Sequence, residues 1–267
     1  MASMEYETLI RLTIFVGLFV IIALIETFIP RRQRGQKRQQ RWATNWAFTF
    51  ANFLLLCVLA TLMPLLAVGA AIDANTHSWG ILNMMQMPVW IEVIIAILVL
   101  DFAIWAQHLI THKVPLLWRI HSVHHADTDM DVSTAIRFHP IEIGLSMILK
   151  ITLVYLLGPS VIAIILFEII LNGTAMFNHA NIRLPLPLDI FLRKILVTPD
   201  MHRIHHSAQR TEHDNNYGFA LSIWDHMFGT YTSEPAMGHE HMQVGLEWQD
   251  DRPSKFVWSL LLPFMRK

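Results

Sequence analysis

The sequence is poor in cysteine and in charged residues. Its only cysteine, Cys57, lies in an apolar run, so an internal disulfide framework and a thiolate-rich metal site are both excluded. Charged residues make up 15% of the 267 residues and nearly cancel, with a formal net charge of −1, so composition gives no bulk attraction to nucleic acid. Hydrophobic residues are 54% of the chain and histidines number 15. The apolar runs and the histidines therefore carry the information about fold and function.

Several apolar runs approach the roughly 20 residues that cross a bilayer. The first run has no basic residue before it and no small-residue cleavage site after it, so we interpret it as a retained anchor and not as a signal peptide. The sequence predicts an all-α, multi-span transmembrane bundle. We expect spans at residues 8–29, 44–68 and 88–110, a mixed loop at 69–87, and two shorter runs at 141–157 and 160–177 that form a tight hairpin or two tilted spans.

A run of six basic residues without an acid, residues 31–41, separates the first two spans. A solvated loop or a nucleic-acid arm fits poorly between two apolar segments, so the positive-inside rule places this run in the cytoplasm. An even number of passes then returns the chain to that side at Asn178. From residue 180 onward we expect a cytoplasmic helical cap. Residues 264–267 carry no retrieval signal, which is compatible with a bacterial inner membrane.

Histidines cluster at the polar ends of these runs, at spacings that place them on one face of a helix. Two copies of the pattern His-x-x-His-His occur, together with one His-x-x-x-His pair and one isolated histidine. Neighbouring imidazoles repel when protonated and need partners when neutral, and metal coordination satisfies them. We therefore predict that nine histidines are metal ligands: His108, His112, His121, His124, His125, His179, His202, His205 and His206.

The number of ligands favours two metals. A structural zinc takes about four ligands and a catalytic zinc about three plus water, so nine histidines fit two metals with positions left open. Ligation that is rich in histidine and poor in carboxylate suits iron that activates dioxygen, although spacing alone does not separate iron from zinc. Single histidines are expected to be ordinary hydrogen-bonded polar groups: His77, His213, His226, His239 and His241.

Two further residues are predicted to be catalytic. Asp101 lies inside the third apolar run, seven residues before His108, where an acid is costly and by default marks function. We expect it to orient an imidazole, with a structural acid bonded to a neighbouring helix as the alternative; Glu168 and Asn172 are further candidates for orienting imidazoles. His139 is expected to be a tenth ligand or a proton-relay group, or else a helix-start histidine with a local hydrogen bond.

The motifs resemble those of the fatty acid hydroxylase / sterol desaturase superfamily of integral-membrane, non-haem di-iron oxygenases. The resemblance covers residues 93–231, and some members have a further histidine where Ala175 stands here. The similar segments are His108-x-x-x-His112, His121-x-x-His124-His125, Phe138-His139-Pro140, Asn178-His179, His202-x-x-His205-His206, Asn216-Tyr217-Gly218 and Trp224-Asp225 to Phe228-Gly229-Thr230-Tyr231.

The resemblance implies two iron ions, with zinc as a substitute, and O2 as co-substrate. It implies hydroxylation or desaturation of a C–H position on a lipid of the sterol or fatty acyl type, in lipid biosynthesis. Electrons would come from a separate donor: a cytochrome b5, a ferredoxin or a flavoprotein reductase. The lipid would enter from the bilayer between the runs at 88–110 and 141–177.

We divide the chain into an N-terminal membrane anchor at 1–87, a catalytic domain at 88–235, and a tail at 236–267 that packs on the cap or the membrane surface. Two other functions are weighed against an oxygenase. A non-redox zinc-dependent lipid hydrolase is expected to carry a motif such as His-Glu-x-x-His, which the sequence lacks. A metal transporter or sensor is expected to place ionisable residues through the depth of several spans, whereas these histidines gather at one surface.

Overall fold

The computed structural model describes residues 2–63 and 66–265, and in this part of the chain all regular secondary structure is helical apart from isolated bridges. The predicted all-α fold is confirmed. Residues 64 and 65, within the expected second span, and the C-terminal 266 and 267 lie outside the described residues.

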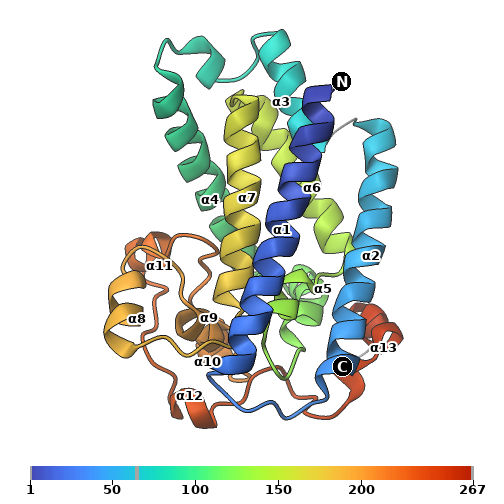
Figure 1. Ribbon diagram of the computed structural model, residues 1–267, viewed down its shortest axis with the longest axis vertical. Helices are drawn as coiled ribbons and strands as arrows, with labels where there is room; N and C mark the ends of the chain where they lie inside the picture. The colour runs from blue at the N-terminus through green and yellow to red at the C-terminus, as the bar shows by residue number, and fades with distance from the viewer. Residues whose placement is uncertain (1, 64–65, 266–267) are drawn as a thin grey trace.

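A bundle of long helices forms the upper part of the molecule (Figure 1). By length and composition, five helical stretches in the described residues can cross a membrane: Thr8–Phe28, Arg38–Thr76, Val89–Lys113, Pro140–Leu157 and Val161–Asn178. The bundle helices are α1 (Ala2–Phe28), α2 (Arg38–Leu62), α3 (Leu66–Thr76), α4 (Val89–Lys113), α6 (Pro140–Leu157) and α7 (Val161–Asn178). The chain is therefore an integral membrane protein, as expected. The predicted boundary between the second span (44–68) and the loop (69–87) is wrong, because α3 covers the end of that span and the first part of that loop.

Helices α6 and α7 run antiparallel and diverge from the short turn that joins them, so that α7 packs on α4 and α1 while α6 packs on α3 and α2 (Figure 1). Helices α6 and α7 each have 18 residues, or about 27 Å at 1.5 Å per residue, close to the thickness of the hydrocarbon core. Gly158 ends α6 with φ of 64°, and a Cβ there would lie 2.2 Å from the carbonyl oxygen of Trp79. Only glycine fits both the left-handed backbone and the close approach of that loop.

Shorter helices form a cap at the lower end of the bundle, where the C-terminus also lies (Figure 1). Helix α13 packs on α2 and η4 packs on α5, so the C-terminal segment covers the cap. The cap elements are α5 (Pro115–His125), η2 (Val132–Ile136), α8 (Leu186–Leu192), α9 (Pro199–His205), α10 (Arg210–His213), α11 (Ile223–Phe228), α12 (Gly238–His241), η3 (Arg252–Ser254), α13 (Phe256–Leu261) and η4 (Leu262–Phe264).

The basic segment at 31–41 is bound to the cap by ion pairs. Arg41, only 1% exposed, donates to Asp127 at 2.6 and 2.8 Å and to Asp131 at 2.9 Å. Arg31 pairs with Asp200 at 3.0 Å. These arginines therefore hold the first two long helices against the cap, whichever side of the membrane the cap occupies. The cytoplasmic placement of the cap stays a prediction.

Candidate metal centre

All nine histidines predicted as ligands are buried where the bundle meets the cap. The last turns of α4 carry His108 and His112. The chain turns at Val114, and Pro115 begins α5 at a position where the missing N–H of proline costs no helical hydrogen bond. His121, His124 and His125 follow on α5, His179 caps the end of α7, and α9 with its C-cap carries His202, His205 and His206.

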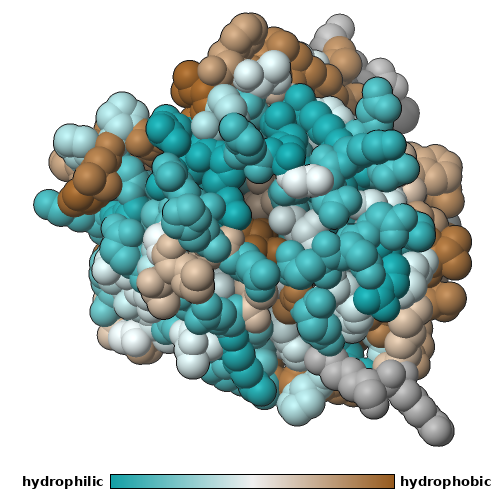
Figure 2. Space-filling view, turned by 90° about the horizontal axis from the view of Figure 1, so that it is seen from below, coloured by the Kyte–Doolittle hydropathy of each residue, from teal (hydrophilic) through white to brown (hydrophobic). Residues whose placement is uncertain are grey.

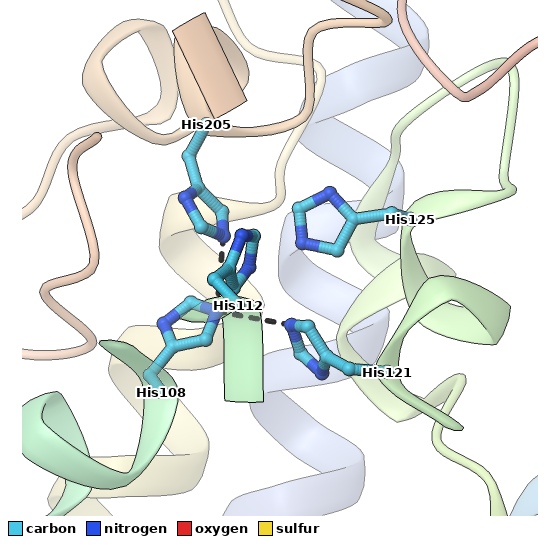
Figure 3. A group of neighbouring side chains, drawn as sticks. All are labelled: His108, His112, His121, His125 and His205. Carbon is cyan, nitrogen blue, oxygen red and sulfur yellow. Dashed lines mark hydrogen bonds between the residues drawn. The ribbon is translucent and has the colours of Figure 1, made fainter. Parts of the chain in front are cut away.

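The nine imidazoles divide into two groups, in each of which the candidate ligand atoms lie within 4.8 Å of one another. Each His-x-x-His-His motif contributes to both groups. Its first and last histidines, at positions i and i+4, join one group, and its middle histidine, at i+3, points to a different side of the helix and joins the other. The first group, drawn in Figure 3, is His108, His112, His121, His125 and His205; the second is His124, His179, His202 and His206. The two groups adjoin, since the rings of His125 and His206 stack with centroids 4.4 Å apart.

Five of the imidazoles are oriented through Nδ1, which donates to an oxygen acceptor. The pairs are His108 to the Tyr217 carbonyl (2.7 Å), His205 to the Asn215 carbonyl (2.7 Å), His179 to the Ala175 carbonyl (2.7 Å), His124 to the Arg137 carbonyl (3.1 Å) and His121 to Glu142 Oε1 (2.6 Å). Because an oxygen accepts at each Nδ1, this nitrogen carries the proton and Nε2 keeps its lone pair. Metal-ligating histidines are fixed in this way by their second nitrogen.

The Nε2 lone pairs of neighbouring imidazoles face one another at about hydrogen-bond distance, an arrangement that is stable only with a cation between them. Nε2 of His108 lies 3.1 Å from Nε2 of His121 and 2.9 Å from Nε2 of His205, the contacts dashed in Figure 3. In the second group, Nε2 of His124 lies 3.0 Å from Nε2 of His179. Two unprotonated nitrogens cannot donate to each other, so these contacts are repulsive without a positive charge.

Other ring nitrogens in the groups are buried and have no hydrogen-bond partner in the part of the chain that the structure describes. Both nitrogens of His112, His125 and His206, and Nδ1 of His202, are in this state. A buried polar atom that lacks a partner costs about 1–3 kcal/mol. One metal ion in each group would accept the lone pairs that face it, so the donor set fits a pair of metals.

Five of the candidate ligands, His124, His125, His179, His202 and His206, are neutral near pH 7. Burial, and after it the neighbouring imidazoles, lower the pKa values of His124, His125, His202 and His206 well below the ordinary value. Burial also lowers the pKa of His179, to about 4. Metal ligation requires the deprotonated ring, and these side chains already have it.

Glu142 is a site residue that sequence reasoning missed. It lies in the first turn of α6, and its Oε1 accepts the Nδ1 proton of His121 at 2.6 Å. Its partner is 21 residues earlier, so no helical spacing links the two. The available signal was an acid at the histidine-rich end of an apolar run, whereas Asp101 was selected because it lies inside such a run.

Asp101 and His139 both lie outside the two groups. Asp101 Oδ2 accepts from the indole N–H of Trp224 at 2.8 Å. His139 caps α6, where its Nδ1 accepts from the backbone N–H of Ile141 at 3.1 Å and its Nε2 contacts the Leu260 carbonyl at 3.2 Å. These contacts favour structural roles, and the catalytic roles of both residues stay predictions.

Glu168 and Asn172 also do not orient imidazoles. Glu168 accepts from Lys150 at 2.8 Å and pairs with Arg11, and Asn172 donates to the Glu168 carbonyl. The expectation that they contact histidines is wrong because two cations from neighbouring helices reach Glu168 inside the bundle. None of the five histidines expected to be ordinary polar groups belongs to either group.

Asp225 holds the backbone segment that fixes His108 of the first group. Its carboxylate accepts from the backbone N–H groups of Tyr217 at 2.9 Å and Gly218 at 2.8 Å, and from the indole of Trp105 at 3.0 Å. The carbonyl of Tyr217 in turn receives the Nδ1 proton of His108. Asp225 therefore positions the backbone that fixes one ligand.

A cavity of about 460 Å³ opens into the bundle beside the first group and has His108 and His121 in its wall. Just over half of its lining residues are apolar, and the polar ones include the hydrogen-bonded pair Gln107 and Ser146 and the ion-paired Arg11, Lys150 and Glu168. Helices α1, α2, α3, α4, α6 and α7 all contribute to its lining, which includes Arg11, Phe15, Thr49, Asn52, Phe53, Leu56, Leu66, Ala67, Ile104, Phe138, Ile143, Met147 and Leu171. The N-terminal helices thus form part of the cavity wall.

Together, the fold and the site define an integral membrane protein with the donor set of a histidine-rich dimetal centre. The chain belongs to the fatty acid hydroxylase family, whose model matches residues 93–230, a range that contains all nine histidines. It is accordingly an oxidoreductase, and the predicted family and enzyme class are confirmed. No solved structure matches the chain.

Similar curated proteins act on several lipids. Ornithine lipid hydroxylase OlsE of Rhizobium tropici is 28% identical over 261 residues, which cover 95% of this chain and 75% of that protein. Human alkylglycerol monooxygenase is 34% identical over 144 residues, covering 52% of this chain and 30% of that protein. The very-long-chain aldehyde decarbonylase GL1-7 of rice is 26% identical over 185 residues, or 63% of this chain and 28% of that protein. The chain thus spans most of OlsE but less than a third of the other two.

Proposed function

We propose that this protein is a membrane-bound di-iron oxygenase that uses O2 and electrons from a separate donor to hydroxylate a lipid C–H position, or to desaturate it. The observation that carries the proposal is the position of His108 and His121 in the wall of the apolar cavity. A lipid chain in this cavity would lie against the first histidine group. A metal transporter has no need for a hydrocarbon cavity at its ligands.

The two histidine groups would hold one iron each. Bound iron would supply the activation of dioxygen that an unactivated C–H bond requires. The protein residues provide the surroundings of that chemistry. Glu142 holds the proton on His121 Nδ1 and so directs the Nε2 lone pair inward, while burial of the histidines keeps bulk water from the site.

The substrate we propose is a lipid with a long aliphatic chain. The names of the relatives mention ornithine lipid, alkylglycerol and very-long-chain aldehyde. The cavity fits such a chain because apolar residues of several membrane-spanning helices line it, and Gln107 and Ser146 could bind a polar group of the lipid. The location of the cavity inside the spanning bundle supports entry of the lipid from the bilayer.

We place the metal centre on the cytoplasmic side, as the basic segment at 31–41 suggests, and in a bacterial inner membrane. A soluble or membrane-bound electron donor would then approach the cap from the cytoplasm: a ferredoxin, a flavoprotein reductase or a cytochrome b5. Fusion of ordinary green fluorescent protein, which becomes fluorescent in the cytoplasm but not after export as an unfolded chain, to the N-terminus and to the C-terminus tests the topology. Fluorescence of the C-terminal fusion alone is expected, and the reverse result would move the centre to the other side.

Metal and product analysis of the purified full chain tests the function. We expect about two irons per chain and a lipid product that carries label from isotopic dioxygen. His202→Ala should lose one iron and the product, whereas His77→Ala should lose neither, because His77 is exposed and lies outside both groups. Zinc in place of iron, together with a product that forms without oxygen, would support the lipid hydrolase instead.

A further inference from the structure

Helix α8 of the cap has a polarity opposite to that of a water-facing helix. Its one acid, Asp189, is 2% exposed and pairs with Arg193, which is 5% exposed. Its apolar residues point outward: Leu186 is 62% exposed and Phe191 is 64% exposed, and Ile195 just beyond the helix is 61% exposed. A helix with polar groups inside and large apolar groups outside is adapted to a hydrocarbon environment.

Helix α11 shows a similar inversion, with His226 as its one exposed polar residue. Asp225 is fully buried among its four donors, while Met227 is 65% exposed and Phe228 is 52% exposed. We call the exposed apolar side chains of these two segments the α8–α11 surface: Leu186, Leu188, Ile190, Phe191, Ile195, Ile223, Met227 and Phe228. Among the exposed residues from 186 to 195, Lys194 is the only charged one, a pattern typical of a side chain that reaches a lipid headgroup.

The contacts of α11 place it at the depth of the bilayer. The ring of Phe228 stacks on Trp105 and Phe102 of α4, with centroids 4.7 and 5.7 Å away. These two residues precede the end of α4 at Lys113 by eight and eleven positions, or about 12 and 16 Å along the helix. The 25 residues of α4 extend about 37 Å, roughly 7 Å more than the hydrocarbon core.

Even if that whole excess projects on the cap side, Trp105 still lies about 5 Å inside the hydrocarbon and Phe102 about 9 Å inside. Helix α11 packs against them at the same level. Figure 1 shows α11 and α8 to the side of the lower part of the bundle, at a higher level than α12. In Figure 2 hydrophilic residues dominate the face of the cap that points away from the bundle, as expected of the aqueous side.

The α8–α11 surface is also continuous with the lipid-facing side of α4. Exposed apolar residues run along that helix, including Trp90, Ile94, Leu98 and Val99, above its contact with α11. A protein partner bound at α11 would have to enter the membrane beside α4. The bilayer needs no such arrangement, because it already surrounds the helix.

We propose that the α8–α11 surface is embedded in the leaflet next to the cap, so that the cap is seated in the membrane and not only tethered to it. The occupant is the acyl and headgroup region of that leaflet. The spanning helices fix the height of the cap, and the α8–α11 surface fixes its tilt against the bilayer. This holds whatever metal or substrate the centre takes.

Site-directed fluorescence in lipid nanodiscs tests the proposal with the full chain. Phe191→Cys and Met227→Cys, each in a Cys57→Ala background, are labelled with bimane and measured with nitroxide placed on lipid acyl chains and with aqueous iodide. Arg210→Cys on α10, where the arginine side chain is 79% exposed, is the aqueous control. The native Cys57, exposed on the spanning helix α2, is the lipid-facing reference.

We expect acyl nitroxide to quench the labels at 191 and 227 several-fold more strongly than the label at 210, and nearly as strongly as the label at Cys57. Iodide should show the opposite order. Labels at 191 and 227 that behave like the one at 210 would overturn the proposal, since the surface would then be in water. Labels protected from both quenchers would also overturn it, because a protein or a second copy of the chain would then cover the surface.

Discussion

Removal of the Glu142 carboxylate is the sharpest test of the metal centre. Its Oε1 lies 2.6 Å from Nδ1 of His121, and among the described residues no other oxygen is bonded to that nitrogen. Glu142→Ala leaves the His121 proton without an acceptor, so the ring can rotate or change tautomer and turn its lone pair away. Glu142→Gln keeps an oxygen acceptor but loses the charge.

Loss of such an outer contact typically lowers metal affinity or activity by about 10- to 100-fold, or about 1.4–2.7 kcal/mol. We expect Glu142→Ala to lower the metal affinity by about 100-fold and Glu142→Gln to lower it by about tenfold. The measurement is a chelator titration of the metal-loaded protein, which gives the chelator concentration that removes half of the metal. Product formation at saturating metal shows whether a well-occupied centre still works.

Glu92→Ala is the matched control. Glu92 and Glu142 are each 9% exposed, and Glu92 Oε1 accepts from the backbone N–H of Ser160 at 2.8 Å, at the other end of the bundle. This variant should lose thermal stability but keep the wild-type chelator midpoint. The reasoning is refuted if Glu142→Ala holds metal as tightly as the wild type, or if Glu92→Ala releases it just as easily.

Three further outcomes follow from the cap. Asp225→Ala should lower product formation at least tenfold with the metal content retained, because the backbone that fixes His108 loses its acceptor. Arg41→Met should cost about 3–5 kcal/mol because it leaves two carboxylates buried without their cation; an unchanged thermal midpoint would contradict this. The folded-state pKa of His179, about 4, lies below its ordinary value, so the unfolded state binds more protons below pH 6.5. Thermal scans of the metal-free protein should therefore show stability falling as pH drops from 6.5 towards 4, by up to about 1.4 kcal/mol per unit for this residue, and a flat profile would count against it.

The helical fold could be predicted because hydrophobic runs of membrane length have few alternatives. Helix ends were less predictable. The second span was expected from residue 44, yet α2 begins at Arg38. The additional turns are stabilised by Arg41, which reaches Asp127, 86 residues later in the chain. No local pattern contains such a contact, so hydropathy locates the core of a span and not its extension into the cap.

The histidines were located by spacing, but their division into two groups was not. Helical periodicity places His121 and His125 on one face and His124 on another. Which group each face joins depends on how α5 approaches α9, and that is a tertiary arrangement. The supporting acids illustrate the same limit. Glu142 and Asp101 both lie on apolar helices. Glu142 accepts a hydrogen bond from an imidazole, whereas Asp101 accepts one from the indole of Trp224 in the cap.

The origin of the cavity wall has a consequence for substrate choice. The segment that matches the family model, residues 93–230, contains all nine histidines and Glu142. Yet the cavity is also lined by Phe15 of α1, Phe53 of α2 and Ala67 of α3, which precede that segment. The N-terminal helices therefore do more than anchor the chain, since they shape the space that meets the ligands His108 and His121. Because these walls and the ligands lie on different helices, substitutions in the walls can change the lipid that fits without moving a ligand, and a comparison confined to the histidine motifs identifies the centre but not the lipid.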